Sequence, residues 1–147
     1  MTYGWAILII LIVAGVLAYY GIFSPSSFLG PTARGFGQVQ VLNPWALAAS
    51  DGSITLNLAN RVGGEINVTN IDFTVGSVNV DCDLDAATSE GIIASGADTV
   101  VSCTPASGWT ALTTGDTYSA TVVISYAYPS GPTAQFSSAG TITGTLS

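Results

Sequence analysis

The side chains that could carry acid–base or nucleophilic chemistry are few, and their types exclude the common catalytic sets. The chain has no His and no Lys, so Ser-His-Asp, Cys-His and Ser-Lys arrangements are ruled out by composition. Paired carboxylates of the glycosidase kind remain, but the nine acidic residues are scattered along the C-terminal part of the chain. We therefore predict that the protein is not an enzyme, with no catalytic residues and no cofactor.

The densest acidic run is Asp-Cys-Asp-Leu-Asp, from Asp81 to Asp85. In an extended segment it would place three carboxylates on one face, and Ca²⁺ favours such oxygen-rich clusters. An EF-hand loop starting at Asp81 would require Gly at its sixth position and Glu at its twelfth. Ala86 and Ile92 stand there instead. We predict no metal site and expect a solvated acidic strand end; a surface Ca²⁺ site of another kind is the alternative.

Cys82 and Cys103 are the two cysteines of the chain. An even count beside an export-type N-terminus predicts one disulfide in an oxidising compartment. Closing a loop of about 20 residues would stabilise the fold by roughly 3 kcal/mol in the chain-entropy description. Two buried free thiols are the alternative.

Asn67 opens the one Asn-x-Ser/Thr sequence, Asn67-Val68-Thr69, within an expected strand. We predict that Asn67 is glycosylated if its side chain lies on the outward face of that strand, although such triplets also occur by chance. Abundant Ser and Thr leave O-linked sugar open as well.

Charge is scarce and unevenly distributed. Arg34 and Arg61 are the basic residues, the formal net charge is −7, and every acidic residue lies at or beyond Asp51. This distribution excludes a nucleic-acid partner, which requires clustered Lys and Arg. Charged residues make up 7% of the chain, so an uncharged polar surface is expected, which suits packing against copies of the same chain or a coat of glycan.

The N-terminal stretch WAILIILIVAGVLAYYGIF, residues 5–23, has no charged residue. As a helix it would cover about 28 Å, close to the hydrocarbon thickness of a bilayer. We predict a long hydrophobic assembly or transmembrane helix over 1–24. Residues 1–4 lack the basic flank of a secretory signal, and no small-x-small cleavage site follows, so the segment is expected to be retained.

The hydrophobic period then changes from helical to alternating. Pro25 ends the predicted helix, a Pro- and Gly-rich linker covers 25–35, and a surface domain covers 36–147. The domain has seven expected strands, at 36–42, 53–60, 65–75, 78–82, 99–103, 117–128 and 135–146. We predict an α+β protein in which the long helix precedes an all-β sandwich with an immunoglobulin-like layout.

The connections between these strands carry weaker signals. Val62-Gly63-Gly64 predicts a hairpin turn between two of the runs. Residues 43–50 predict a short helical turn or a packed loop, and 86–98 predict a loop inside the disulfide.

The N-terminal run MTYGWAILIILIVAGVLAYYGIFSPSSF resembles that of archaeal type IV pilin-like proteins with class III signal peptides. The likeness is strongest over Met1–Leu8 and the Gly-Ile-Phe-Ser-Pro exit. Such pilins carry a Glu near the mature N-terminus, whereas no acidic residue precedes Asp51 here. The resemblance therefore implies either assembly without that ion pair or a start upstream of Met1.

The resemblance implies a major pilin of an extracellular, cell-surface filament used for adhesion or surface contact. Its partners would be copies of itself in a helical homopolymer, the membrane before assembly, a prepilin-peptidase-like enzyme and the pilus-assembly machinery. The helices would form the filament core, and small residues would let them approach closely. The residues expected to pack there are Trp5, Ile9, Ile12, Ala14, Gly15, Ala18 and Tyr19.

Two other functions share this architecture. The first is a monomeric membrane-anchored module whose sandwich loops bind a sugar or a surface protein, although the sequence predicts no aromatic-lined groove. The second is a subunit of an archaellum-type motility filament.

Overall fold

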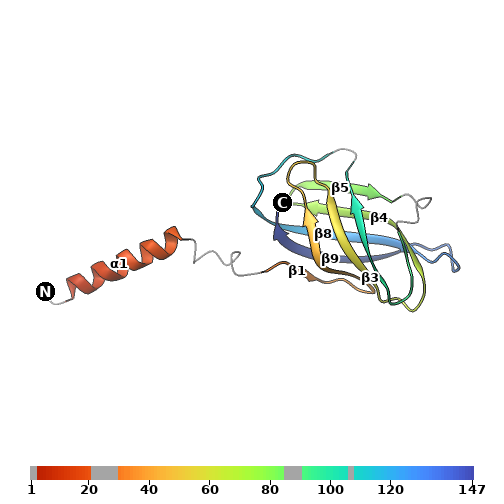
Figure 1. The fold of residues 1–147 in the computed structure, drawn as a ribbon, viewed down its shortest axis with the longest axis horizontal. Coiled ribbons are helices and arrows are strands. Elements are labelled where there is room, and N and C mark those ends of the chain that lie inside the picture. The colour runs from red at the N-terminus through yellow and green to blue at the C-terminus, as the bar shows by residue number, and fades with distance from the viewer. Residues whose placement is uncertain (1–2, 21–29, 85–90, 106–107) are drawn as a thin grey trace. The chain divides into compact units, whose positions relative to one another are not determined.

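The computed structural model describes residues 3–20, 30–84, 91–105 and 108–147, apart from the side chain of Asp83. The chain divides into two compact units, Met1–Gly30 and Pro31–Ser147. The first contains helix α1 (Gly4–Tyr19) and the second contains two antiparallel sheets (Figure 1).

The long helix predicted over 1–24 is wrong. Helix α1 has 16 residues, which corresponds to about 24 Å, and at its C-terminal end the Tyr20 N–H donates to the Val16 carbonyl. The apolar side chains of a segment determine which environment buries it as a helix, but they do not determine at which residue the helix ends. Among the described residues, no helix combines the length and apolarity needed to cross a bilayer.

The fold is accordingly mostly β, and not the predicted α+β combination with a long helix. All seven expected strands occur, as β2 (Val39–Leu47), β3 (Ile54–Asn60), β4 (Ile66–Val75), β5 (Val78–Asp83), β7 (Asp98–Cys103), β8 (Thr117–Ala127) and β9 (Phe136–Thr145). Two short strands were not predicted, β1 (Thr32–Arg34) within the expected linker and β6 (Ile92–Ile93) within the expected loop.

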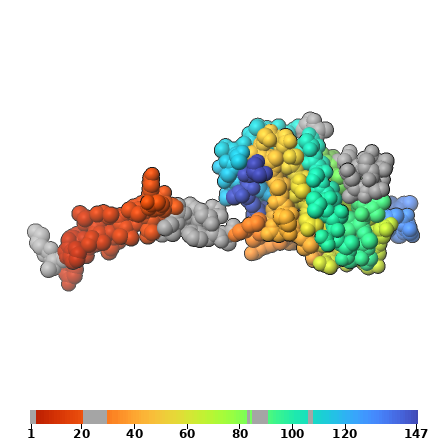
Figure 2. Space-filling model, in the orientation of Figure 1, coloured from red at the N-terminus to blue at the C-terminus, as the bar shows by residue number. Residues whose placement is uncertain are grey.

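One sheet has the order β1-β9-β8-β4-β5, with β6 paired to β4, and the other has the order β2-β3-β7. The outer face of the smaller sheet is turned toward the viewer in Figure 2, where β2, β3 and β7 form adjacent orange, yellow and teal columns. The order β2-β3-β7 opposite β9-β8-β4 is the one that immunoglobulin sandwiches use for strands A-B-E and G-F-C.

Both sheets contribute to one hydrophobic core. Alternation along β8 buries every second residue from Tyr118 to Tyr126, and β4 and β3 show the same period. Fully buried side chains from the two sheets belong to a single cluster. They include Leu56 and Leu58 on the smaller sheet and Ile71, Phe73 and Ile124 on the larger one. This arrangement is that of a β-sandwich.

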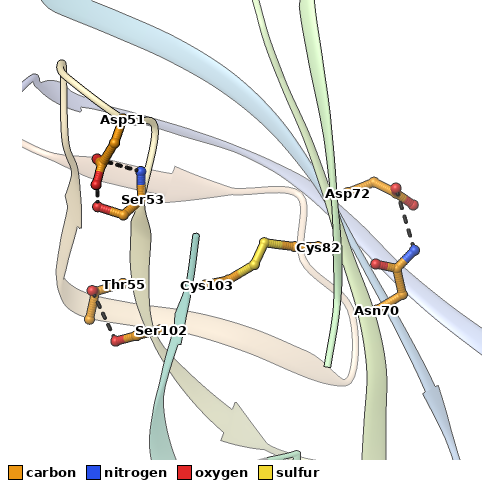
Figure 3. The surroundings of a disulfide bond; sticks show 8 residues. All are labelled: Asp51, Ser53, Thr55, Asn70, Asp72, Cys82, Ser102 and Cys103. Atoms are coloured by element: carbon orange, nitrogen blue, oxygen red, sulfur yellow. Dashed lines mark hydrogen bonds between the residues drawn. A yellow bond between two sulfur atoms is a disulfide. The ribbon is translucent and has the colours of Figure 1, made fainter. Parts of the chain in front are cut away.

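The two sheets are also tied together at both edges. At one edge the Cys82–Cys103 disulfide joins β5 to β7, with a Cα–Cα distance of 6.2 Å (Figure 3), which confirms the predicted pairing. At the other, the Ser138 hydroxyl on β9 donates to the Val39 carbonyl on β2 at 2.8 Å and accepts from the Gly37 N–H at 3.0 Å. Sliding of one sheet over the other is therefore blocked at both edges.

Residues 43–47 continue β2 and form neither a helical turn nor a loop. Register with β3 shifts between Leu42 and Ala46, and the cis Asn43–Pro44 bond lies in this irregular stretch. Pro44 has no N–H to give to the sheet, so a bulge on an edge strand accommodates it.

The segment Val62-Gly63-Gly64 is not a hairpin turn, because β3 and β4 belong to different sheets. It crosses from one sheet to the other and is held by Asn60, which is fully buried. The Asn60 amide donates to the carbonyls of Gly64 at 2.8 Å, Ile93 at 2.9 Å and Ala94 at 3.1 Å, and its Oδ1 accepts from the Val62 N–H at 2.8 Å. One side chain thus bonds to four backbone groups, two in the crossover and two at the end of β6.

We expect reduction of the disulfide to lower the free energy of unfolding by about 3 kcal/mol, because an open chain gains conformational freedom when unfolded. Urea unfolding with and without reductant measures this, and a Cys82→Ser, Cys103→Ser double variant should match the reduced protein. Equal midpoints for all three samples would show that the tie at this edge contributes nothing.

We expect Asn60→Ala to cost about 3 kcal/mol, because several buried backbone groups lose their partners. Asn57→Ala is the matched control, since Asn57 lies on β3 and its Oδ1 makes no hydrogen bond. Chemical denaturation of both variants should separate them clearly; similar losses would contradict the role given to Asn60.

Candidate assembly site

Helix α1 is apolar over its whole circumference. Its residues from Trp5 to Val16 include no polar side chain, and none of its residues is buried by the described structure. Trp5 and Tyr19, both predicted for filament-core packing, are 68% and 88% exposed. A helix of this composition is stable in water only when another apolar surface covers it.

The predicted packing residues divide between two faces of this helix. At 100° per residue, Trp5, Ile9, Ile12 and Tyr19 fall on one face, since they are spaced by four, three and seven positions. We call this the large face. All four of its side chains are exposed aromatic or β-branched groups of large volume.

Ala14 and Ala18 lie one turn apart on the C-terminal half of the opposite face, and we call this half the small face. The N-terminal half of the same face carries Ile7 and Leu11. Gly15 lies to one side of it, and nothing within 4 Å would meet a Cβ added there. The seven residues predicted for filament-core packing were expected as one set, without a division into two faces. The spacing i, i+4, i+7 from Trp5 was the signal that could have revealed it.

The remaining predicted site residue, Asn67, lies in β4 and is half-buried. Its neighbours in register are Ala127 on β8 and Ile92 on β6, and its Oδ1 is buried without a hydrogen-bond partner. The Thr69 hydroxyl of the same triplet donates to the Ser125 carbonyl at 3.3 Å. Glycosylation of Asn67 stays a prediction.

The acidic groups form no common site within the part of the chain that the structure describes, where no three of them are placed to hold a metal ion. Asp81 is exposed and faces Asp72 across the β4–β5 pair, while Asp85 lies outside the described residues. Asp51 is held locally: the Ser53 N–H at 3.1 Å and hydroxyl at 2.9 Å keep the pKa of its carboxyl below the ordinary value. Figure 3 shows Asp51 and Asp72 on separate elements of the sandwich.

Comparison with known proteins identifies no family. No protein-family model and no curated protein matches this chain.

Glycosylation of Asn67 can be tested on one fragment, because trypsin cleaves after Arg34 and Arg61 and leaves residues 62–147 intact. We expect this fragment from native material to exceed its sequence mass by that of a glycan, and Thr69→Val to abolish the excess. A fragment of unmodified mass would disprove the prediction. An excess that persists in Thr69→Val would place the sugar on other residues.

Proposed function

We propose that this chain is a structural subunit, a major pilin, of an extracellular type IV pilus-like filament. Copies of α1 pack together as the filament core, and the β-sandwich unit forms the exterior. The single observation that supports this most strongly is an uncharged helix that is apolar on every side.

Copies of the same helix are the partner that fits this surface best. The large face of one helix, with Trp5 and Ile12, complements the small face of the next, with Ala14 and Ala18. Because the two faces are on opposite sides, such contacts are heterologous, and they build an open helical polymer when the rotation between neighbours does not close a ring. Close approach of small residues adds dispersion contacts along the helix.

The sandwich unit suits an exterior position. It has its own core and a disulfide, and it contains all nine acidic residues. Mutual repulsion of these charges disfavours close packing of the sandwich units and leaves the uncharged helices as the adhesive part. The proposal includes a membrane-associated store of subunits, processing by a prepilin-peptidase-like enzyme, and use of the filament for surface contact.

We expect Ala14→Leu to abolish filaments, because three added side-chain carbons on the small face prevent close approach of the neighbouring helix. Ile12→Leu keeps the volume of the large face and should leave assembly nearly unchanged. Negative-stain imaging of native material and of both variants measures this.

Two results would count against the proposal. Native material that consists of dispersed single subunits would exclude a filament altogether. Filaments of Ala14→Leu with unchanged diameter and abundance would show that the small face is not a helix contact.

A further inference from the structure

The sandwich unit has a pocket of about 430 Å³ between two loops, and no residue of the candidate assembly site lines it. Its lining residues are Gly64, Glu65, Tyr128, Pro129, Ser130, Gly131 and Pro132. The volume lies within the range of small-molecule sites, about 300–1,000 Å³.

Strand pairing brings the two loops together. Asn67 on β4 pairs with Ala127 on β8 in an antiparallel register, so Glu65, two positions before, approaches Pro129, two positions after. The Asn60 amide holds the Gly64 carbonyl at 2.8 Å and so fixes the first loop. The second loop starts with a turn in which the Gly131 N–H donates to the Tyr128 carbonyl at 3.4 Å.

The Tyr128 ring packs against two other aromatic rings. It packs edge to face against Phe136, with ring centres 5.2 Å apart, and against Tyr126 at 6.3 Å. Burial raises the pKa of the Tyr126 phenol above its ordinary value, and the neighbouring Tyr128 phenol raises it further. The Tyr126 phenol therefore stays neutral. A Cβ on Gly131 would lie 2.8 Å from the Tyr128 Cβ, so only glycine allows the loop to pass this close.

The pocket thus combines one fixed aromatic ring, two proline rings, one carboxylate and one hydroxyl. The Glu65 carboxylate is exposed and makes no hydrogen bond or ion pair with any described residue. Its acceptor capacity is therefore free for a ligand. Pro129 and Pro132 restrict the loop backbone, which reduces the entropy lost on binding.

We propose that this pocket binds the pyranose ring of a carbohydrate. The C–H face of a pyranose is apolar and slightly positive, so it stacks on the negative face of an aromatic ring such as Tyr128. Two neighbouring hydroxyl groups of the sugar donate to the two oxygens of the Glu65 carboxylate, in charge-assisted hydrogen bonds. The Ser130 hydroxyl supplies a further donor or acceptor.

A quaternary ammonium ion is the other class of ligand that a carboxylate and a ring attract. Sites for such cations surround the charge with several ring faces. Here Tyr128 is the one aromatic residue among the seven that line the pocket. A single flat platform with hydrogen-bonding groups at its side favours the sugar.

The site goes beyond the proposed filament role and does not depend on it, because every lining residue belongs to the unit Pro31–Ser147. Binding is measured on the purified full chain, whether assembled or dispersed. Absence of filaments would thus leave this test intact, and absence of binding would leave the filament proposal intact.

The probes are methyl α-D-mannopyranoside, methyl β-D-glucopyranoside and methyl β-D-galactopyranoside, titrated separately and followed by ligand-observed NMR, with choline chloride as the cationic probe. We expect saturable binding of at least one glycoside. Glu65→Gln should weaken it about tenfold, as loss of a charge-assisted hydrogen bond does.

Substitutions of Tyr128 test the role of the aromatic ring, and substitution of a distant carboxylate is the control for Glu65→Gln. Tyr128→Ala should weaken glycoside binding by at least about tenfold, whereas Tyr128→Phe, which keeps the ring, should change it less than about threefold. Asp116→Asn is the control for Glu65→Gln, because Asp116 is an exposed carboxylate that precedes the opposite end of β8.

Three results would overturn the proposal. The first is the absence of saturable binding for all three glycosides. The second is glycoside binding that Glu65→Gln and Tyr128→Ala leave unchanged. The third is binding of choline, sensitive to the same two variants, without binding of any glycoside, which would assign the pocket to a cation.

Discussion

Burial of apolar side chains is the constraint on which this molecule depends, and its two units meet it differently. In Pro31–Ser147 the apolar residues of β3, β4 and β8 face one another across two sheets and are covered within the chain. In Met1–Gly30 the apolar residues of α1 lie on every side of a single helix, so they cannot cover one another. Since exposed apolar area costs about 25 cal/mol per Å² in water, the helix is complete only in contact with a further apolar surface.

The sandwich, in contrast, needs nothing from outside to hold its shape. The disulfide ties one edge of the two sheets, Ser138 ties the other, and Asn60 ties the crossover between them. These ties have a second consequence, because Asn60 also holds the loop that presents Glu65. Rigid strands and fixed loops allow a surface site to keep its geometry while the unit is displayed on a larger assembly.

The strands were predictable because alternation of apolar and polar residues is a local property of the sequence. All seven strands were found from it, and the cysteine count predicted the Cys82–Cys103 pair. The strands β1 and β6 were missed since three and two residues are too short to show a period. The sequence of Val62-Gly63-Gly64 specifies a turn but not whether the next strand joins the same sheet.

The length of α1 and the pocket could not be predicted for a different reason. Hydrophobicity continues past Tyr19, so it overestimated the helix, and the membrane-spanning interpretation that rested on it is wrong. The pocket depends on pairing between β4 and β8, which brings Glu65 beside Pro129 although the two are far apart in sequence. The expected strands 117–128 and 135–146 left a connection between them, but contacts between distant connections follow only from the strand register.

The central claim is that copies of α1 bury one another. Helical reconstruction by cryo-electron microscopy of native filaments tests it most directly, because side-chain density identifies the neighbours of each residue. The account predicts a core in which Trp5 and Ile12 of one subunit contact Ala14 and Ala18 of another, with the sandwich units outside. A filament whose core is formed by the sandwich units, with α1 exposed or separate, would contradict it.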